Sequence, residues 1–143
     1  MAPSRSPFSY AVMRIVPDIE REEFLNAGLI VFCRPRRFLV ARTTLDAVAL
    51  ATLRPDCELD GIGDQLQFIE HVAAGEVVAG PFATMSQSER FHWLTTPRST
   101  LVQPGPIHAG TTDDPTTTFE RLYGMLVTRP SPTEGPHGPN PAP

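Results

Sequence analysis

The chain has 143 residues and a formal net charge of −4 at pH 7, a length suited to one hydrophobic core but too short for two ordinary domains. The acidic balance argues against a protein whose whole surface holds nucleic acid. All 12 basic residues are arginines, which excludes chemistry that requires a lysine, such as a Schiff base or the phosphate-binding lysine of a P-loop.

Three strands are predicted in the first third of the chain. Residues 8–16, FSYAVMRIV, are rich in aromatic and β-branched types on both alternating faces, and Pro17 ends them. The acidic segment that follows is either a helical turn or an extended polar loop. Residues 24–33 and 38–42 predict two further strands, joined by a hairpin loop. Gly28 predicts a bulge or a close backbone approach, or else a strand that begins only after it.

Two helices are predicted next. Residues 45–53 are rich in alanine and leucine, and Pro55 follows directly after their last turn. Residues 60–74 carry apolar side chains at three- and four-residue spacing, which indicates one buried helix face, and Gly75 closes this helix.

The last third predicts two helices and a short strand. Ser86 and Glu89 form a reciprocal capping arrangement at the start of residues 86–94. Residues 101–103 have extended character among prolines and predict an edge strand. Either Asp113 or Asp114 caps a final helix, which has Pro115 in its first turn.

These elements predict an α+β fold: a small antiparallel sheet of three to four strands covered by three to four helices. We expect residues 1–129 to form a single domain. From residue 130 onward six of the 14 residues are proline and apolar residues nearly vanish. This composition predicts a disordered tail over residues 130–143.

The chain gives no sign of a metal, a cofactor or a membrane anchor. Cys33 and Cys57 form no CxxC motif, and no histidine stands at zinc-finger spacing. The acidic residues that follow Pro17 match no calcium loop and are interpreted as surface. The amino terminus lacks the features of a secretory signal, so we expect the cytoplasm. No apolar stretch approaches the roughly 20 residues that cross a bilayer.

Residues 88–114 concentrate polar side chains on a proline-punctuated segment, where binding sites often lie. Arg98, Ser99 and Thr100 together are suited to hold a phosphate or carboxylate, because a guanidinium offers paired donors in one plane. The alternative is a capped loop with one solvated arginine. Trp93 belongs either to the core or to a partner surface.

His108 is the candidate general base or metal ligand of this segment. An aspartate, Asp113 or Asp114, is placed to orient its imidazole, which makes His108 and Asp114 the catalytic candidates. The alternative is a hydrogen-bonded loop histidine beside a helix cap. Arg90 either pairs with one of these aspartates or points into the same pocket as Arg98.

A basic hairpin tip is the remaining feature, and it is either solvated or touches an acidic protein or a phosphate backbone. It comprises Arg34, Arg36 and Arg37.

With SYAVMRIVPDIEREEFLNAGLIVF near its start and SERFHWLTTPRSTLVQPGPIHAGTTDDP later, the chain resembles the bacterial family named domain of unknown function 3037. The resemblance covers the body from about residue 8 to residue 127. It implies no activity, but proteins similar to this family can be encoded beside kinases that resemble persistence toxins, which favours a protein partner. The matching positions are Arg14, Pro17, Glu23, Phe24, Asn26, Gly28, Arg90, Phe91, Trp93, Leu94, Arg98, Ser99, Gln103, His108 and Asp114.

The leading hypothesis is therefore an accessory protein that binds a partner protein or an anionic ligand through a surface lined by arginine, tryptophan and histidine. We expect its two sequence blocks to meet around one cleft. The alternative is an enzyme acting on a phosphate-containing substrate with His108 as general base; a third reading is nucleic-acid binding at the hairpin tip. The binding candidates are Arg14, Asn26, Arg90, Trp93, Arg98, Ser99, Gln103 and His108.

Overall fold

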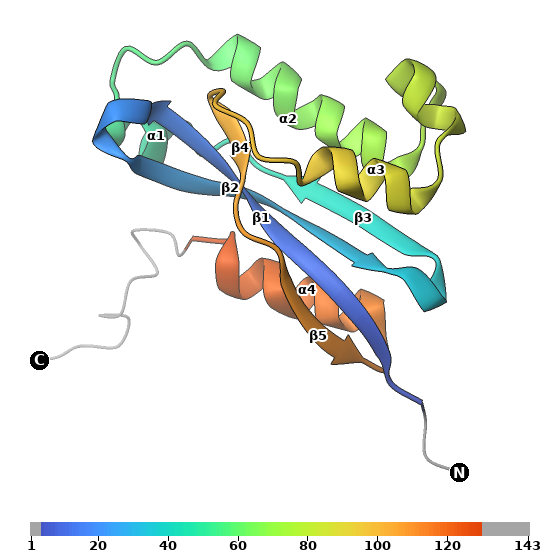
Figure 1. The fold of residues 1–143 in the computed structure, drawn as a ribbon. Coiled ribbons are helices and arrows are strands. Elements are labelled where there is room, and N and C mark those ends of the chain that lie inside the picture. Colours follow the sequence, from blue (N-terminus) through green and yellow to red (C-terminus); the bar gives the residue numbers. More distant parts are fainter. Residues whose placement is uncertain (1–3, 130–143) are drawn as a thin grey trace, which may run out of the picture.

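The computed structural model describes residues 4–129, and its centre is a five-stranded antiparallel sheet. The long strand β1 (Ser6–Asp18) pairs with β2 (Glu23–Cys33), which pairs in turn with β3 (Phe38–Thr43). On its other side β1 pairs with β4 (Val102–Pro104) and with β5 (His108–Thr112), each along a different part of its length. β3 and the β4–β5 segment therefore form opposite edges (Figure 1).

Helices cover both faces of the sheet. α1 (Ala47–Leu53), α2 (Leu59–Ala74) and α3 (Gln87–Leu94) belong to one side, and α4 (Pro115–Leu126) lies on the other (Figure 1). The described residues also contain three 3₁₀ segments: η1 (Ile19–Arg21), η2 (Arg34–Arg36) and η3 (Val77–Thr84). The predicted α+β class with a small antiparallel sheet is confirmed.

The two faces of the sheet bury two separate cores. Met13 and Ile15 of β1 pack into the core under α2 and α3. Phe8 of the same strand packs with Phe119 and Leu122 of α4. Successive side chains of a strand point to opposite faces, so β1 needs apolar residues at both sets of positions. This explains the nearly continuous apolar run of its sequence.

A bulge in β2 changes which side chains face α4. Met13 lies opposite Gly28 and Arg14 lies opposite Asn26, so Ala27 is an extra residue in β2. Leu29 and Val31 face α4, whereas Leu25 and Ala27 join the core under α2. The extra residue inverts the alternation of β2 and turns Asn26 toward the α4 side. The bulge predicted from Gly28 is therefore present, and the strand begins before it.

The helix boundaries follow the local signals in the sequence. Gly75 ends α2 with φ at 69°, in the left-handed region that favours glycine. The Ser86 side chain accepts a hydrogen bond from the Glu89 amide, and the Glu89 carboxylate accepts one from the Ser86 amide. The bond from the Ser86 amide to the carboxylate is the main cause that lowers the pKa of Glu89. Asp114, not Asp113, caps α4.

Two local expectations were wrong. β1 continues through Pro17 to Asp18, because the strand end still pairs with β2 there. No strand was predicted over residues 108–112, but they form β5, which pairs with the first residues of β1. A glycine is needed within β5, since a Cβ atom at Gly110 would lie 2.9 Å from the Phe8 ring.

The predicted tail, residues 130–143, lies outside the described residues. Among residues 4–129 there is no helix with the length and apolar character needed to span a bilayer.

Candidate functional site

The candidate residues do not gather in one cleft, so the expectation of a single site was wrong. Arg14, Asn26 and Gln103 lie in a row across three strands on the α4 side of the sheet. Trp93 and Arg98 line a groove on the α2 side. Arg90 is a buried residue of α3, and His108 is exposed on the edge strand β5. The sheet separates Arg14 from the other two arginines.

The row on the α4 side joins the two distant sequence blocks. Arg14 of β1 lies directly opposite both Asn26 of β2 and Gln103 of β4. Residues opposite one another in antiparallel strands point to the same face, with Cβ atoms about 4.5–5.5 Å apart. The Asn26 amide donates to the Leu126 carbonyl at the end of α4, and the Gln103 amide donates to the Thr100 carbonyl.

The Arg14 guanidinium is held between a ring and a backbone segment. Its Cζ atom lies 4.1 Å from the centroid of Phe24. On another side Gly105 lies so close that a Cβ atom there would be 3.0 Å from the same Cζ. The Nε atom is buried and has no hydrogen-bond partner among the described residues. Phe24 and Gly105 were not among the sequence-based site candidates, although Phe24 stands in the quoted family pattern.

Arg90 has a structural role. Its Nη1 donates to the Met85 carbonyl at 2.5 Å and its Nη2 to the Ala73 carbonyl at 3.4 Å. The guanidinium also lies against Gly75, the C-cap of α2. A cation at this position complements the negative end of the α2 dipole. Neither sequence-based expectation for Arg90, pairing with an aspartate or sharing a pocket with Arg98, describes these contacts.

Trp93 and Arg98 form one side of a groove between α2, α3 and β4. Arg98 lies over the Trp93 ring, with Cζ 4.6 Å from the centroid. The Trp93 ring contacts Phe82 at 4.5 Å and Phe68 at 6.2 Å between centroids. The groove has a volume of about 360 Å³, and its lining residues are Asp64, Gln65, Phe68, Ile69, Trp93, Arg98, Thr100 and Val102.

The Arg98 guanidinium donates its hydrogen bonds to backbone carbonyls at the end of α3. It donates to the carbonyl of Trp93, in the last turn of α3, and to that of Thr96, just beyond the helix. Partial burial lowers the pKa of Arg98, but an arginine remains charged at neutral pH. Ser99 is exposed and Thr100 donates to the Val102 carbonyl, so no hydrogen bond links either hydroxyl to Arg98. The described contacts correspond more closely to a capped helix end than to a three-residue anion site.

His108 and Asp114 lie apart on the α4 side. His108 is opposite Tyr10, with ring centroids 5.2 Å apart. β5 runs from His108 to Thr112, and the turn to Asp114 begins at its far end. A rise of about 3.3 Å per strand residue puts that end about 13 Å from His108. The Asp114 carboxylate accepts hydrogen bonds from the Thr116 amide and the Thr117 hydroxyl. The proposed acid–base pair is therefore not assembled, and the arginines meant to hold its substrate lie across the sheet.

The hairpin arginines are partly engaged within the fold. Arg36 donates to the Ser6 hydroxyl and to the carbonyls of Ser4 and Asp113. Arg34 and Arg37 are exposed. Further along β3, Arg42 forms paired hydrogen bonds with Glu120 of α4, which raise the pKa of Arg42 and lower that of Glu120. Residues 4–129 contain no group of three or more potential metal ligands.

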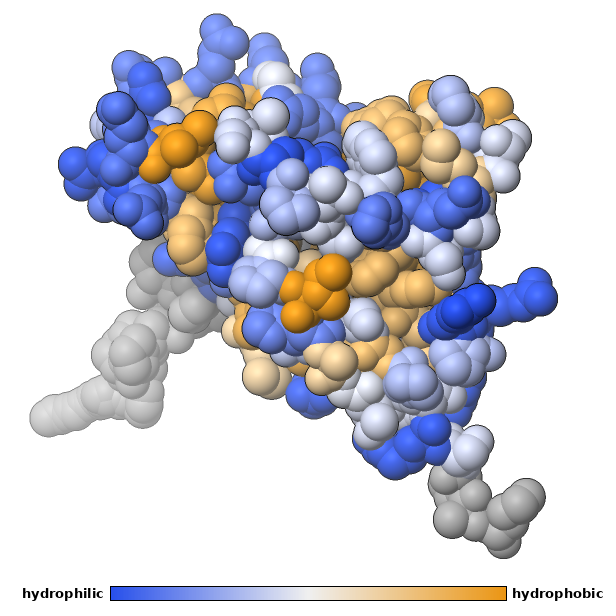
Figure 2. Space-filling model, in the orientation of Figure 1, coloured by the Kyte–Doolittle hydropathy of each residue, from blue (hydrophilic) through white to orange (hydrophobic). Residues whose placement is uncertain are grey.

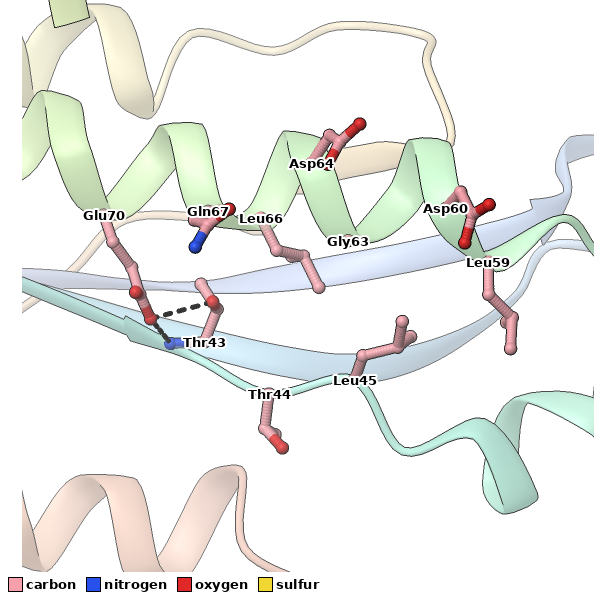
Figure 3. A pocket seen from close by; sticks show the side chains of 10 residues that line it. All are labelled: Thr43, Thr44, Leu45, Leu59, Asp60, Gly63, Asp64, Leu66, Gln67 and Glu70. Atoms are coloured by element: carbon pink, nitrogen blue, oxygen red, sulfur yellow. Dashed lines mark hydrogen bonds between the residues drawn. The ribbon is translucent and has the colours of Figure 1, made fainter. Parts of the chain in front are cut away.

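A further hollow was not predicted from the sequence. It lies between α2 and the end of β3 and has a volume of about 690 Å³ (Figure 3). Glu70 points to Thr43 and accepts hydrogen bonds from its amide and hydroxyl, whereas Asp64 points away from β3 (Figure 3). The carboxylates that line the hollow do not converge on a common point, so they do not form a recognisable catalytic or metal-binding arrangement.

Comparison with known families agrees with the resemblance of the two sequence blocks. Residues 10–127 match the family model described as Protein of unknown function (DUF3037). The chain belongs to this family. The matched region includes every candidate site residue and all four α-helices of the fold. No curated protein and no solved structure gives a significant match. Family membership therefore supplies no substrate or partner.

Proposed function

We propose that this family member is a non-catalytic binding protein, and that it docks a partner protein on the surface formed by α2, η3 and α3. This surface comprises Phe68 of α2, Val77, Val78 and Phe82 of η3, and Trp93 of α3. Arg98 borders it. The candidate general base has no assembled partner, which leaves binding as the function that the geometry supports best.

Exposed apolar side chains are the observation that carries the proposal. Val77 and Val78 are 89% and 67% exposed, and Phe68 beside the groove is 37% exposed. Apolar atoms gather over η3 at the top right of the molecule (Figure 2). Clustered exposed apolar side chains often mark an interaction site, since their exposure to water is costly.

The aromatic residues and the arginine suit a protein partner. Tryptophan and arginine are enriched among the residues that dominate binding energy at protein interfaces. The Trp93 ring is held by Phe82 and Arg98, so little rotamer freedom remains to be lost when a partner covers it. The resemblance noted above makes a kinase similar to persistence toxins the first partner to test.

The test compares substitutions of equal chemistry inside and outside this surface. Tagged wild-type protein and the Val77→Asp, Val78→Asp and Val48→Asp variants are used for pull-downs from the native host. Val48 is 78% exposed on α1 and lies outside the proposed docking surface. We expect a stoichiometric partner with wild type and Val48→Asp, and loss of it with the two η3 variants. Equal recovery by all four proteins, or no stoichiometric partner at all, would refute the proposal.

A further inference from the structure

We propose that Arg14 binds an oxyanion, a carboxylate or phosphate group of a ligand, on the α4 side of the sheet. This site lies on the face opposite the proposed docking surface and does not depend on it. Asn26 and Gln103 flank Arg14, and Phe24 and Gly105 hold its guanidinium.

The first argument is the missing acceptor. Arg90, Arg98 and Arg42 all donate hydrogen bonds to carbonyls or carboxylates within the fold. The Nε atoms of Arg14 and Arg90 are both buried without a partner, but both Nη atoms of Arg90 donate to carbonyls. The half-buried side chain of Arg14 makes no hydrogen bond or ion pair at all with residues 4–129. A buried donor without an acceptor is costly to folding. Such a group is expected where a ligand supplies the acceptor.

The second argument is preorganisation. The Phe24 ring and the Gly105 backbone restrict the guanidinium, so its N–H groups are aimed before any ligand arrives. A Cβ atom at position 105 would lie 3.0 Å from the Arg14 Cζ and would displace the guanidinium slightly, whereas glycine leaves that space free. A guanidinium with a fixed plane binds the paired oxygens of a carboxylate or phosphate with little loss of conformational freedom.

The third argument is the charge of the neighbours. The residues opposite Arg14 on both adjoining strands are neutral amides, Asn26 and Gln103. Glu23, the carboxylate of the same strand as Asn26, is engaged by Arg21 at 2.8 Å. The positive charge of Arg14 is therefore left without a local carboxylate partner, and an anionic group is the complementary ligand.

The test is an NMR titration of the ¹⁵N-labelled protein. Sodium phosphate and sodium acetate are each added at an ionic strength matched with sodium chloride, and the Arg14 Nε–H signal and the Asn26 and Gly105 amides are followed. We expect saturable shifts with at least one of the two anions and none with chloride. Saturation by phosphate alone identifies a phosphate ligand, and saturation by acetate identifies a carboxylate ligand. Failure of both anions to saturate the shifts would overturn the proposal.

Two arginine variants separate a specific site from general attraction. Arg14→Met keeps an unbranched side chain on Phe24 and removes the donors, and we expect its affinity to fall by about tenfold or more. The matched control, Arg34→Met, removes an exposed arginine and should bind as wild type does. Equal binding by Arg14→Met, or an equal loss in Arg34→Met, would contradict the site.

A third variant keeps the inference testable if Arg14→Met does not fold. Gly105→Ala places a Cβ atom 3.0 Å from the Arg14 Cζ, so the guanidinium must shift while the arginine remains present. We expect weaker anion binding with a preserved fold. Unchanged affinity in a folded Gly105→Ala protein would show that the arrangement around Arg14 is not the binding site.

Discussion

Arg90 illustrates how a buried charged side chain can be structural. Its guanidinium joins the end of α2 to the residues that precede α3. Removal of its donors leaves the Ala73 and Met85 carbonyls without these partners. We expect Arg90→Ala to lower the free energy of unfolding by about 2–4 kcal/mol, measured by urea denaturation. Arg34→Ala is the control and should stay within about 0.5 kcal/mol of wild type. A change that small in Arg90→Ala would contradict this structural role.

Two glycines of the α2 region should respond to alanine in opposite directions. Gly75 has φ at 69°, and a Cβ atom there would lie 3.2 Å from the Arg90 Cζ. We expect Gly75→Ala to destabilise the fold by about 1–2 kcal/mol. Gly61 lies within α2 and has open space around it, so Gly61→Ala should stabilise the fold by up to about 1 kcal/mol. Chemical denaturation of both variants measures the two changes, and changes of equal sign would contradict this expectation.

At the scale of elements, the start of α4 depends on the charge of Asp114. Hydrogen bonds, first from the Thr117 hydroxyl and then from the backbone amides of Thr117 and Thr116, lower the pKa of the Asp114 carboxyl. A carboxyl whose pKa is lower in the folded state stabilises the fold above its unfolded pKa. This stabilisation is lost as the pH falls through the folded value.

Substitution of Asp114 should therefore have an effect that depends on pH. We expect Asp114→Ala to lower the melting temperature at pH 7, and the difference from wild type to shrink as the pH falls below the range in which the carboxylate titrates. Thermal melts at several pH values measure this difference. The neighbouring Asp113→Ala, which removes only an exposed carboxyl 4.0 Å from Arg5, is the control. A difference that does not change with pH would exclude the charged cap.

The helix and turn signals were largely predictable because each arises within a few residues. The Ser86–Glu89 capping box, the Gly75 terminus and Pro115 in the first turn of α4 all appear where the local patterns placed them. β5 was missed for the opposite reason. A strand that contains Gly110 beside His108 has weak intrinsic preference, and it forms because the first residues of β1 offer a free edge.

At the scale of the whole molecule, two cores share one sheet. β1 contributes Met13 to one core and Phe8 to the other, so loss of either core removes contacts from the same strand. We therefore expect residues 4–129 to unfold as one cooperative unit.

Two core substitutions on opposite faces test this cooperativity. Phe119→Ala on the α4 side should cost about 3–5 kcal/mol, and Ile69→Ala on the α2 side about 2–5 kcal/mol. Both side chains are buried. Each variant should shift a single transition, observed in parallel by circular dichroism and tryptophan fluorescence. If Phe119→Ala separated the two signals, because α4 melted before the region around Trp93, the molecule would contain two units.

The candidate site was only partly predictable. Arg14, Asn26 and Gln103 belong to two distant sequence blocks, and the pairing of β1 with β2 and β4 places them in one row. Arg90, Trp93 and Arg98 were expected in the same cleft but lie across the sheet. Phe24 and Gly105 became relevant only through their contacts with the Arg14 guanidinium.

The sequence by itself determined the α+β class, most of the strands and helices and the caps at their ends, because these depend on neighbours within one or two turns. Only the tertiary structure decided which residues share a face. The extra residue Ala27 inverts the alternation of β2 and turns Asn26 toward Arg14, and the pairing of β4 with β1 adds Gln103. Strand register is set by contacts between residues far apart in the chain, so local patterns cannot specify it.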